Sequence, residues 1–253
     1  MKTLKNRILS GAMAGVLAMS LAVPAFAAGG TPAPAAANTT EIDGAYQAVT
    51  IDVVVPATGN ATINPYGLPI EVPKSAGGKV TFENQKIMTA PTAAIKNKMK
   101  INLTVKAAVT GAVKELTDAD AIPMKLASEA LTADTTAKSV FAYVQAKPST
   151  STGDDTAVPD KLIDEYAAWK QDYSADTDIL VKAGTVTKEN FVTLKAAKMD
   201  TTSGAFSEYN AGSIALIRVA GDAVASPKDA WTTADGFTVK IAYTFAPAPA
   251  AAP

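Results

Sequence analysis

One stretch near the C-terminus decides the fold class: Phe237-Thr238-Val239-Lys240-Ile241-Ala242-Tyr243-Thr244-Phe245. Its large apolar side chains occupy every second position, and Thr, Lys or Ala fill the positions between them. Because successive side chains of a strand point to opposite faces, this alternation predicts a β-strand with one buried face. The same period of two recurs at residues 49–55 and 99–109. At residues 213–219 both faces are apolar, which predicts a central strand.

Further strand candidates are short and are separated by turn residues. They lie at residues 61–64, 68–72, 79–83, 139–145 and 191–196. The turn residues 56–60 predict a hairpin that joins 49–55 to 61–64. Pro69 and Pro73 restrict the strand between them to a sheet edge, because proline cannot donate a ladder hydrogen bond.

These strands predict an all-β fold, a two-sheet antiparallel sandwich of the jelly-roll kind, because no crossover helices separate them. One short helix is expected after Pro159, with Asp160 as its cap. Its apolar face is formed, at spacings of three or four, by Leu162, Ile163, Tyr166, Trp169 and Tyr173. A helix this short is marginal alone, so we expect it to cover one end of the sandwich within an insertion at about residues 147–184. The aromatic stripe is interpreted as core packing rather than as a partner site.

The N-terminus has the pattern of a secretory signal peptide. Lys2, Lys5 and Arg7 precede the apolar residues 8–23, and Pro24-Ala25-Phe26-Ala27 supplies small residues for cleavage. The apolar stretch is too short and too rich in alanine for a membrane anchor. We therefore expect residues 1–27 to be removed from a secreted, extracellular protein that associates with the cell surface and has no membrane contact after cleavage.

The mature chain is predicted to be one domain between two tails. Residues 28–44 and 246–253 are rich in Pro and Ala and cannot build a core, which leaves 45–245 for the β-sandwich. Cleavage removes three cations and no acid, so the net charge falls from -1 to -4. This mildly acidic balance does not favour nucleic acid as a partner.

The composition excludes most familiar enzyme chemistry. The chain contains no histidine and no cysteine, so it lacks imidazole bases, thiolate nucleophiles, disulfides and the usual zinc, haem and iron-sulfur ligands. The serine hydrolase motifs Gly-x-Ser-x-Gly and Ser-x-x-Lys are also absent. We therefore expect no catalytic, cofactor-binding or metal-binding residues, no cofactor and no enzymatic activity.

Carboxylates alone could still support a glycosidase or a calcium site. The acidic pairs close in sequence are Asp118 with Asp120, Asp154 with Asp155, Asp164 with Glu165, and Asp176 with Asp178. Neighbouring residues diverge on a helix, and neither Asp-x-Asp pair has the glycine and distal glutamate of an EF-hand loop. The two Asp-x-Asp pairs are interpreted as solvated turn acids, Asp154 and Asp155 as residues of a polar loop, and none of the four pairs as a catalytic pair.

The order of features resembles a known family. It consists of a signal peptide, the strand at 49–55, Thr62-Ile63-Asn64-Pro65-Tyr66, the segment 94–105, a polar insertion with a helix, and the closing strand 239–245. This layout resembles the camelysin and biofilm-matrix fibre proteins of Gram-positive bacteria, jelly-roll sandwiches that assemble by donating an N-terminal strand. The resemblance implies a polymerising subunit whose donor is residues 41–47, since the Pro/Ala-rich residues 28–37 would pair poorly. Camelysin is associated with protease activity, but without histidine a conventional zinc site cannot be carried over.

Three functional hypotheses follow. The first is a non-catalytic structural protein of the bacterial cell surface or biofilm matrix, which associates with itself by strand donation or with other surface proteins. The second is a monomeric module that binds glycan or cell wall, with Tyr66, Trp169 and Trp231 as stacking surfaces. The third is a carboxylate-dependent hydrolase, which requires a carboxyl pair at catalytic separation in a cleft.

Overall fold

The computed structural model describes residues 51–56, 61–117, 122–170 and 172–248. The predicted signal peptide at 1–27 and N-terminal tail at 28–44 lie outside the described residues. The chain divides into the units Met1–Ile51 and Asp52–Pro253, and the described strands all belong to the second unit.

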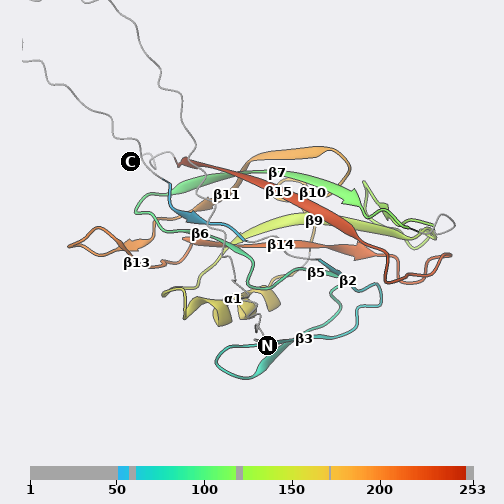
Figure 1. The fold of residues 1–253 in the computed structure, drawn as a ribbon, viewed down its shortest axis with the longest axis horizontal. Coiled ribbons are helices and arrows are strands. Elements are labelled where there is room, and N and C mark those ends of the chain that lie inside the picture. Colours follow the sequence, from blue (N-terminus) through green and yellow to red (C-terminus); the bar gives the residue numbers. More distant parts are fainter. Residues whose placement is uncertain (1–50, 57–60, 118–121, 171, 249–253) are drawn as a thin grey trace, which may run out of the picture. The chain divides into compact units, whose positions relative to one another are not determined.

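Two antiparallel sheets dominate the second unit, which confirms the predicted all-β sandwich (Figure 1). The main sheet has the strand order β1 (Val53–Val54), β6 (Ala94–Asn97), β14 (Ile214–Ala223), β9 (Ser139–Pro148) and β10 (Ile179–Leu180), and β8 (Lys125–Leu126) pairs in parallel with β9. The smaller sheet has the order β11 (Thr185–Leu194), β7 (Leu103–Val113) and β15 (Phe237–Pro247).

Three two-stranded sheets complete the strands of the described residues. They pair β2 (Thr62–Ile63) with β5 (Ile87–Met88), β3 (Ile70–Pro73) with β4 (Lys79–Phe82), and β12 (Lys198–Met199) with β13 (Phe206–Glu208). The predicted hairpin between residues 49–55 and 61–64 is therefore wrong, because β1 pairs with β6 and β2 with β5. Apolar alternation identifies a strand but not its partner, and here both partners lie further along the chain.

Strand β14 lies at the centre of the main sheet, between β6 and β9, as its two apolar faces predict. The side chains of Ile214 and Leu216 pack on the helical side of the sheet. Ile217 and Val219 are also buried, and the two-residue period of the strand places them on the opposite face. That second face belongs to the core between the sheets, to which β7 contributes a fully buried apolar row.

The helix α1 (Val158–Ala167) buries three of the predicted residues, Leu162, Ile163 and Tyr166. It packs against the outer face of the main sheet, with the β3–β4 hairpin against its other side, rather than at an end of the sandwich (Figure 1). The reason is that α1 has two apolar sides. Leu162 contacts the cluster of β14 residues, whereas Ile163 and Tyr166 join the hairpin residues around Phe82.

The predicted cap of this helix is also wrong. Helix α1 begins at Val158, so Pro159 and Asp160 both lie in its first turn. Proline fits this turn because the first backbone N–H groups of a helix have no partner within it. The Asp160 carboxylate instead accepts hydrogen bonds of 2.8 Å from the backbone N–H groups of Ser75 and Ala76. It therefore fastens the turn of the β3–β4 hairpin to the helix.

Candidate functional site

The acidic pairs are engaged with other protein groups. Asp164 forms an ion pair with Lys74 at 2.6 Å, and Glu165 accepts hydrogen bonds from residues 150 and 151. Asp155 lies 2.9 Å from Lys96 and 3.0 Å from Lys98, and it accepts a 2.8 Å hydrogen bond from the Tyr209 hydroxyl. These contacts join α1, its preceding loop and the neighbouring hairpins.

The two Asp-x-Asp pairs considered as calcium ligands differ in what the structure shows of them. Asp118 and Asp120 lie outside the described residues. Asp176 is exposed, but Asp178 is buried and accepts hydrogen bonds of 2.8 Å from Gln145 and 2.8 Å from the backbone N–H of Ser174. Interpreting Asp178 as a solvated acid was therefore wrong. Within the part of the chain that the structure describes, no three acidic side chains are grouped to hold a metal ion.

A buried arginine organises the outer face of the main sheet. Arg218 of β14 has no exposed surface, and its guanidinium lies 3.8 Å from the centre of the Trp169 ring. It donates hydrogen bonds to the Gln145 side chain at 2.8 Å, to the Trp169 carbonyl at 2.7 Å and to the Lys170 carbonyl. Burial lowers the pKa of Arg218 to about 10, so the group stays charged at neutral pH.

This network fixes the segment that follows α1. Arg218 holds the carbonyls of Trp169 and Lys170, and the Gln145 amide donates to the carbonyl of Asp172 at 2.9 Å. The same amide also donates to the buried Asp178. The segment is thus attached to both β9 and β14, and Tyr173 packs against Phe141 and Tyr143 of β9.

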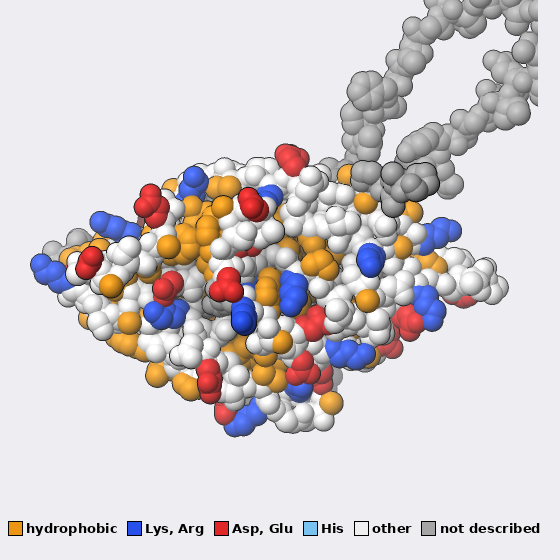
Figure 2. Space-filling view, turned by 180° about the vertical axis from the view of Figure 1, so that it is seen from behind, with side chains coloured by type: hydrophobic (Ala, Val, Ile, Leu, Met, Phe, Trp, Pro, Cys, Tyr) orange, Lys and Arg blue, Asp and Glu red, His pale blue; other side chains and the backbone are white. Residues whose placement is uncertain are grey.

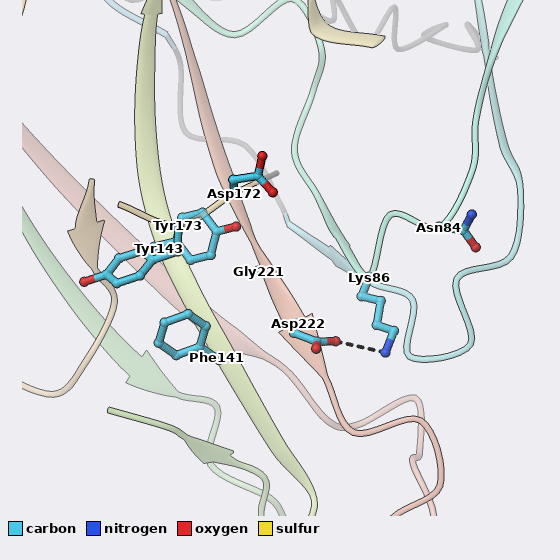
Figure 3. Close-up of a pocket in the computed structure, with 8 residues that line it drawn as sticks. All are labelled: Asn84, Lys86, Phe141, Tyr143, Asp172, Tyr173, Gly221 and Asp222. Atoms are coloured by element: carbon cyan, nitrogen blue, oxygen red, sulfur yellow. Dashed lines mark ion pairs between the residues drawn. The ribbon is translucent and has the colours of Figure 1, made fainter. Parts of the chain in front are cut away.

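An open cleft of about 540 Å³ lies at this position (Figure 3). It is lined by Asn84, Lys86, Phe141, Tyr143, Asp172, Tyr173, Gly221 and Asp222. These residues come from the loop before β5, from β9, from the segment after α1 and from β14. The cleft therefore brings together four parts of the chain that are far apart in sequence.

Three aromatic rings form one side of the cleft. The ring of Tyr173 lies 5.2 Å from that of Phe141 and 5.1 Å from that of Tyr143, between ring centres. Phe141 and Tyr143 are buried, whereas Tyr173 is 40% exposed. Burial raises the pKa of Tyr143 to about 12, so its hydroxyl stays protonated. Tyr173 is thus the ring that a ligand would reach.

Polar groups lie opposite the rings (Figure 3). Lys86 forms an ion pair with Asp222 at 2.9 Å and donates to the Ala223 carbonyl at 3.3 Å. Glycine is required at position 221, directly before Asp222 in β14. Gly221 has φ +149°, and a Cβ at this position would lie 2.0 Å from the Phe141 carbonyl oxygen. Only glycine allows β14 and β9 to approach this closely here.

The three aromatic residues proposed as stacking surfaces do not form one site. Tyr66 is 64% exposed in the turn after β2, but Trp169 packs on Arg218 and on the core. The indole N–H of Trp231 donates to the Val224 carbonyl at 2.8 Å. None of the three lines the cleft. One signal for the missed site was present in the sequence, namely the charged Arg218 inside the apolar run of β14.

A second feature is the open edge of β15. This strand pairs with β7 along its whole length of 11 residues, and no described strand pairs with its other edge. The alternating apolar side chains of β15 are only half-buried. Burial raises the pKa of the Tyr243 hydroxyl, which finds no hydrogen-bond partner among the described residues.

The backbone groups of β15 alternate between β7 and the open edge. The Gly236 carbonyl accepts a hydrogen bond from the backbone N–H of Lys114, which directly follows β7. The Ala248 N–H donates a hydrogen bond to the carbonyl of Asn102, which directly precedes β7. Even-numbered residues of this regular antiparallel pair therefore bond to β7, and odd-numbered residues direct their N–H and C=O groups to the open edge. These odd positions carry the apolar row from Phe237 to Phe245.

No family model, curated protein or solved structure matches the chain. Among the described residues, no helix has the length and apolar character needed to cross a bilayer. Charges of both signs are interspersed on the face shown in Figure 2, with apolar side chains between them. That face therefore carries no broad patch of a single sign of charge.

Proposed function

We propose that this chain is a non-catalytic structural protein of the bacterial cell surface or extracellular matrix, secreted and then assembled by strand addition. The observation that supports the proposal is the open edge of β15. A strand that pairs there gains main-chain hydrogen bonds and covers the half-buried apolar row. Its partners would be further copies of the same chain.

The other sheet edges in the described residues are poor acceptors. The outer strands of the main sheet, β1 and β10, have two residues each. Strand β11, at the opposite edge of the smaller sheet, has an irregular register between Lys188 and Val192. Short strands and bulges discourage pairing between molecules, whereas a long and regular edge promotes it. Strand β15 keeps one register from Phe237 to Pro247 and has no such protection along its apolar row.

The donor remains the segment predicted from the sequence, residues 41–47. A strand of this length extends about 23 Å at roughly 3.3 Å per residue, which is shorter than the 11-residue edge of β15.

The experiment compares the mature chain from Ala28 with a variant that lacks residues 28–46, at equal concentration, by light scattering and negative-stain microscopy. Filaments are expected only from the longer chain. Val239→Pro in the longer chain removes an N–H that faces the open edge without removing a bond to β7, and it should also prevent filaments. Circular dichroism checks that both variants remain folded.

Three results would contradict the proposal. The first is that both chains stay monomeric over a wide range of concentration. The second is that the truncated chain polymerises as well as the longer one. The third is that folded Val239→Pro protein forms normal filaments, which would reject the β15 edge as the acceptor. Monomeric behaviour would leave glycan or cell-wall binding as the function to pursue.

A further inference from the structure

We infer that the cleft of Figure 3 binds an uncharged oligosaccharide, with Tyr173 as the stacking surface and Asp172 as a hydrogen-bond acceptor for sugar hydroxyls. The inference concerns a different surface from the β15 edge and does not rest on assembly. The volume of the cleft, about 540 Å³, is in the ordinary range for small-ligand sites.

The aromatic residues favour a flat ligand over a small cation. A cation-binding cage needs rings that surround an empty space. Here the Phe141, Tyr143 and Tyr173 rings fill the space between themselves, with centres 5.1 to 5.7 Å apart. Tyr173 meets Phe141 edge to face at 84°, and it alone of the three is substantially exposed. One exposed aromatic surface suits the apolar C–H face of a pyranose ring.

The charges disfavour an anionic ligand. Lys86 is the cation that lines the cleft, and its ion pair with Asp222 at 2.9 Å neutralises it. Asp172 is exposed, and among the described residues no lysine or arginine forms an ion pair with it. An acidic polymer would be repelled, whereas a carboxylate can accept hydrogen bonds from two sugar hydroxyls.

The site is held in place before any ligand arrives. Arg218 and Gln145 fix the segment that carries Asp172 and Tyr173. On the opposite side, Asn84 has a left-handed backbone with φ +57°, and its N–H donates to the Gly67 carbonyl at 3.3 Å. Because these positions are fixed by the protein, little conformational entropy is lost when a ligand binds.

The test uses saturation-transfer difference NMR, which observes the sugar and therefore works whether or not the protein assembles. The probes are cellotriose, maltotriose, mannotriose and N-acetylated chitotriose, with trigalacturonic acid as the anionic control. At least one neutral probe should receive saturation from the mature chain, and trigalacturonic acid should receive none. If no neutral probe responds at millimolar concentration, or if only the acid does, the inference is wrong.

Matched variants locate the binding. Tyr173→Ala should weaken binding about tenfold or more through loss of the stacking surface, and Asp172→Ala should weaken it similarly. Tyr173→Phe keeps the ring and should keep most of the affinity. Tyr66→Ala removes an exposed tyrosine that does not line the cleft and should have no effect. If Tyr66→Ala weakens binding and folded Tyr173→Ala does not, the site lies elsewhere and the inference is overturned.

Discussion

Arg218→Ala should destabilise the protein more than any exposed substitution, because the buried guanidinium serves three acceptors, of which the Gln145 side chain is itself buried. The variant leaves the Gln145 side-chain oxygen and the carbonyls of Trp169 and Lys170 without their donor. An unsatisfied buried acceptor costs about 1–3 kcal/mol, and water that enters the vacated space recovers part of this. We expect a net loss of about 2–4 kcal/mol in the free energy of unfolding.

Urea unfolding provides the measurement, followed by circular dichroism and by tryptophan fluorescence. Trp169 reports locally because its ring centre lies 3.8 Å from the guanidinium carbon. Arg218→Lys keeps the charge but not the planar fork of donors, so it should lie between wild type and Arg218→Ala. Lys182→Ala, at an exposed side chain, is the control and should change stability by less than about 0.5 kcal/mol.

The reasoning fails if Arg218→Ala changes stability no more than the control. It also fails if the tryptophan emission maximum, to which Trp169 and Trp231 both contribute, is unchanged in the folded variant, because the segment after α1 would then be held by other contacts.

Three further predictions concern other contacts. Burial alone would raise the pKa of Asp155, but hydrogen bonds from two lysines and a tyrosine lower it from 3.8 to about 2. The ionised Asp155 carboxylate therefore stabilises the fold by about 1 kcal/mol, because solvent screens its ion pairs. This contribution is present above pH 3.8 and is lost as the pH falls toward 2. Asp155→Asn should flatten this part of the plot of melting temperature against pH. Gly221→Ala places a Cβ 2.0 Å from the Phe141 carbonyl oxygen, so the melting temperature should fall sharply; an unchanged value would contradict the close approach. Lys138→Met removes the ammonium 3.0 Å from the buried Asp235 carboxylate and leaves only the hydrogen bonds from Thr232, so the protein should lose about 1.5–3 kcal/mol in urea unfolding. Adding Asp235→Leu should recover most of that loss.

The sequence was a good guide to the existence of strands and a poor guide to their partners. The period of two identified β15, and the two apolar faces identified β14 as central. Pairing was different: the nearest alternating segment was taken as the partner of 49–55, whereas β1 pairs with β6, some forty residues further on. Local periodicity contains no information about such distant contacts.

The helix and the cleft show that local spacing is also a poor guide to which side chains contact each other. Spacing alone predicted the burial of Leu162 and Ile163. It also assigned Tyr173 to the helix face, although α1 ends at Ala167 and Tyr173 instead packs on Phe141 of β9. The cause is Arg218, which binds carbonyls beyond the helix end and so directs the chain across the sheet. A tertiary contact of this kind overrides the helical period.

The assembly edge and the proposed sugar site belong to different layers of the fold. Strand β15 lies in the smaller sheet, whereas the cleft is lined by residues of β9 and β14 in the main sheet and by loop residues (Figure 3). A strand added at β15 extends the smaller sheet and does not need any residue that lines the cleft. Each copy in a filament would therefore keep its cleft available, and a row of weak sites would gain strength from multivalent binding to a polysaccharide. This combination leads to a specific expectation: filaments should be retained on a matrix of the bound sugar more strongly than truncated monomer, and Tyr173→Ala filaments should lose that retention while keeping their form. Equal retention of monomer and filament would show that the two surfaces do not act together.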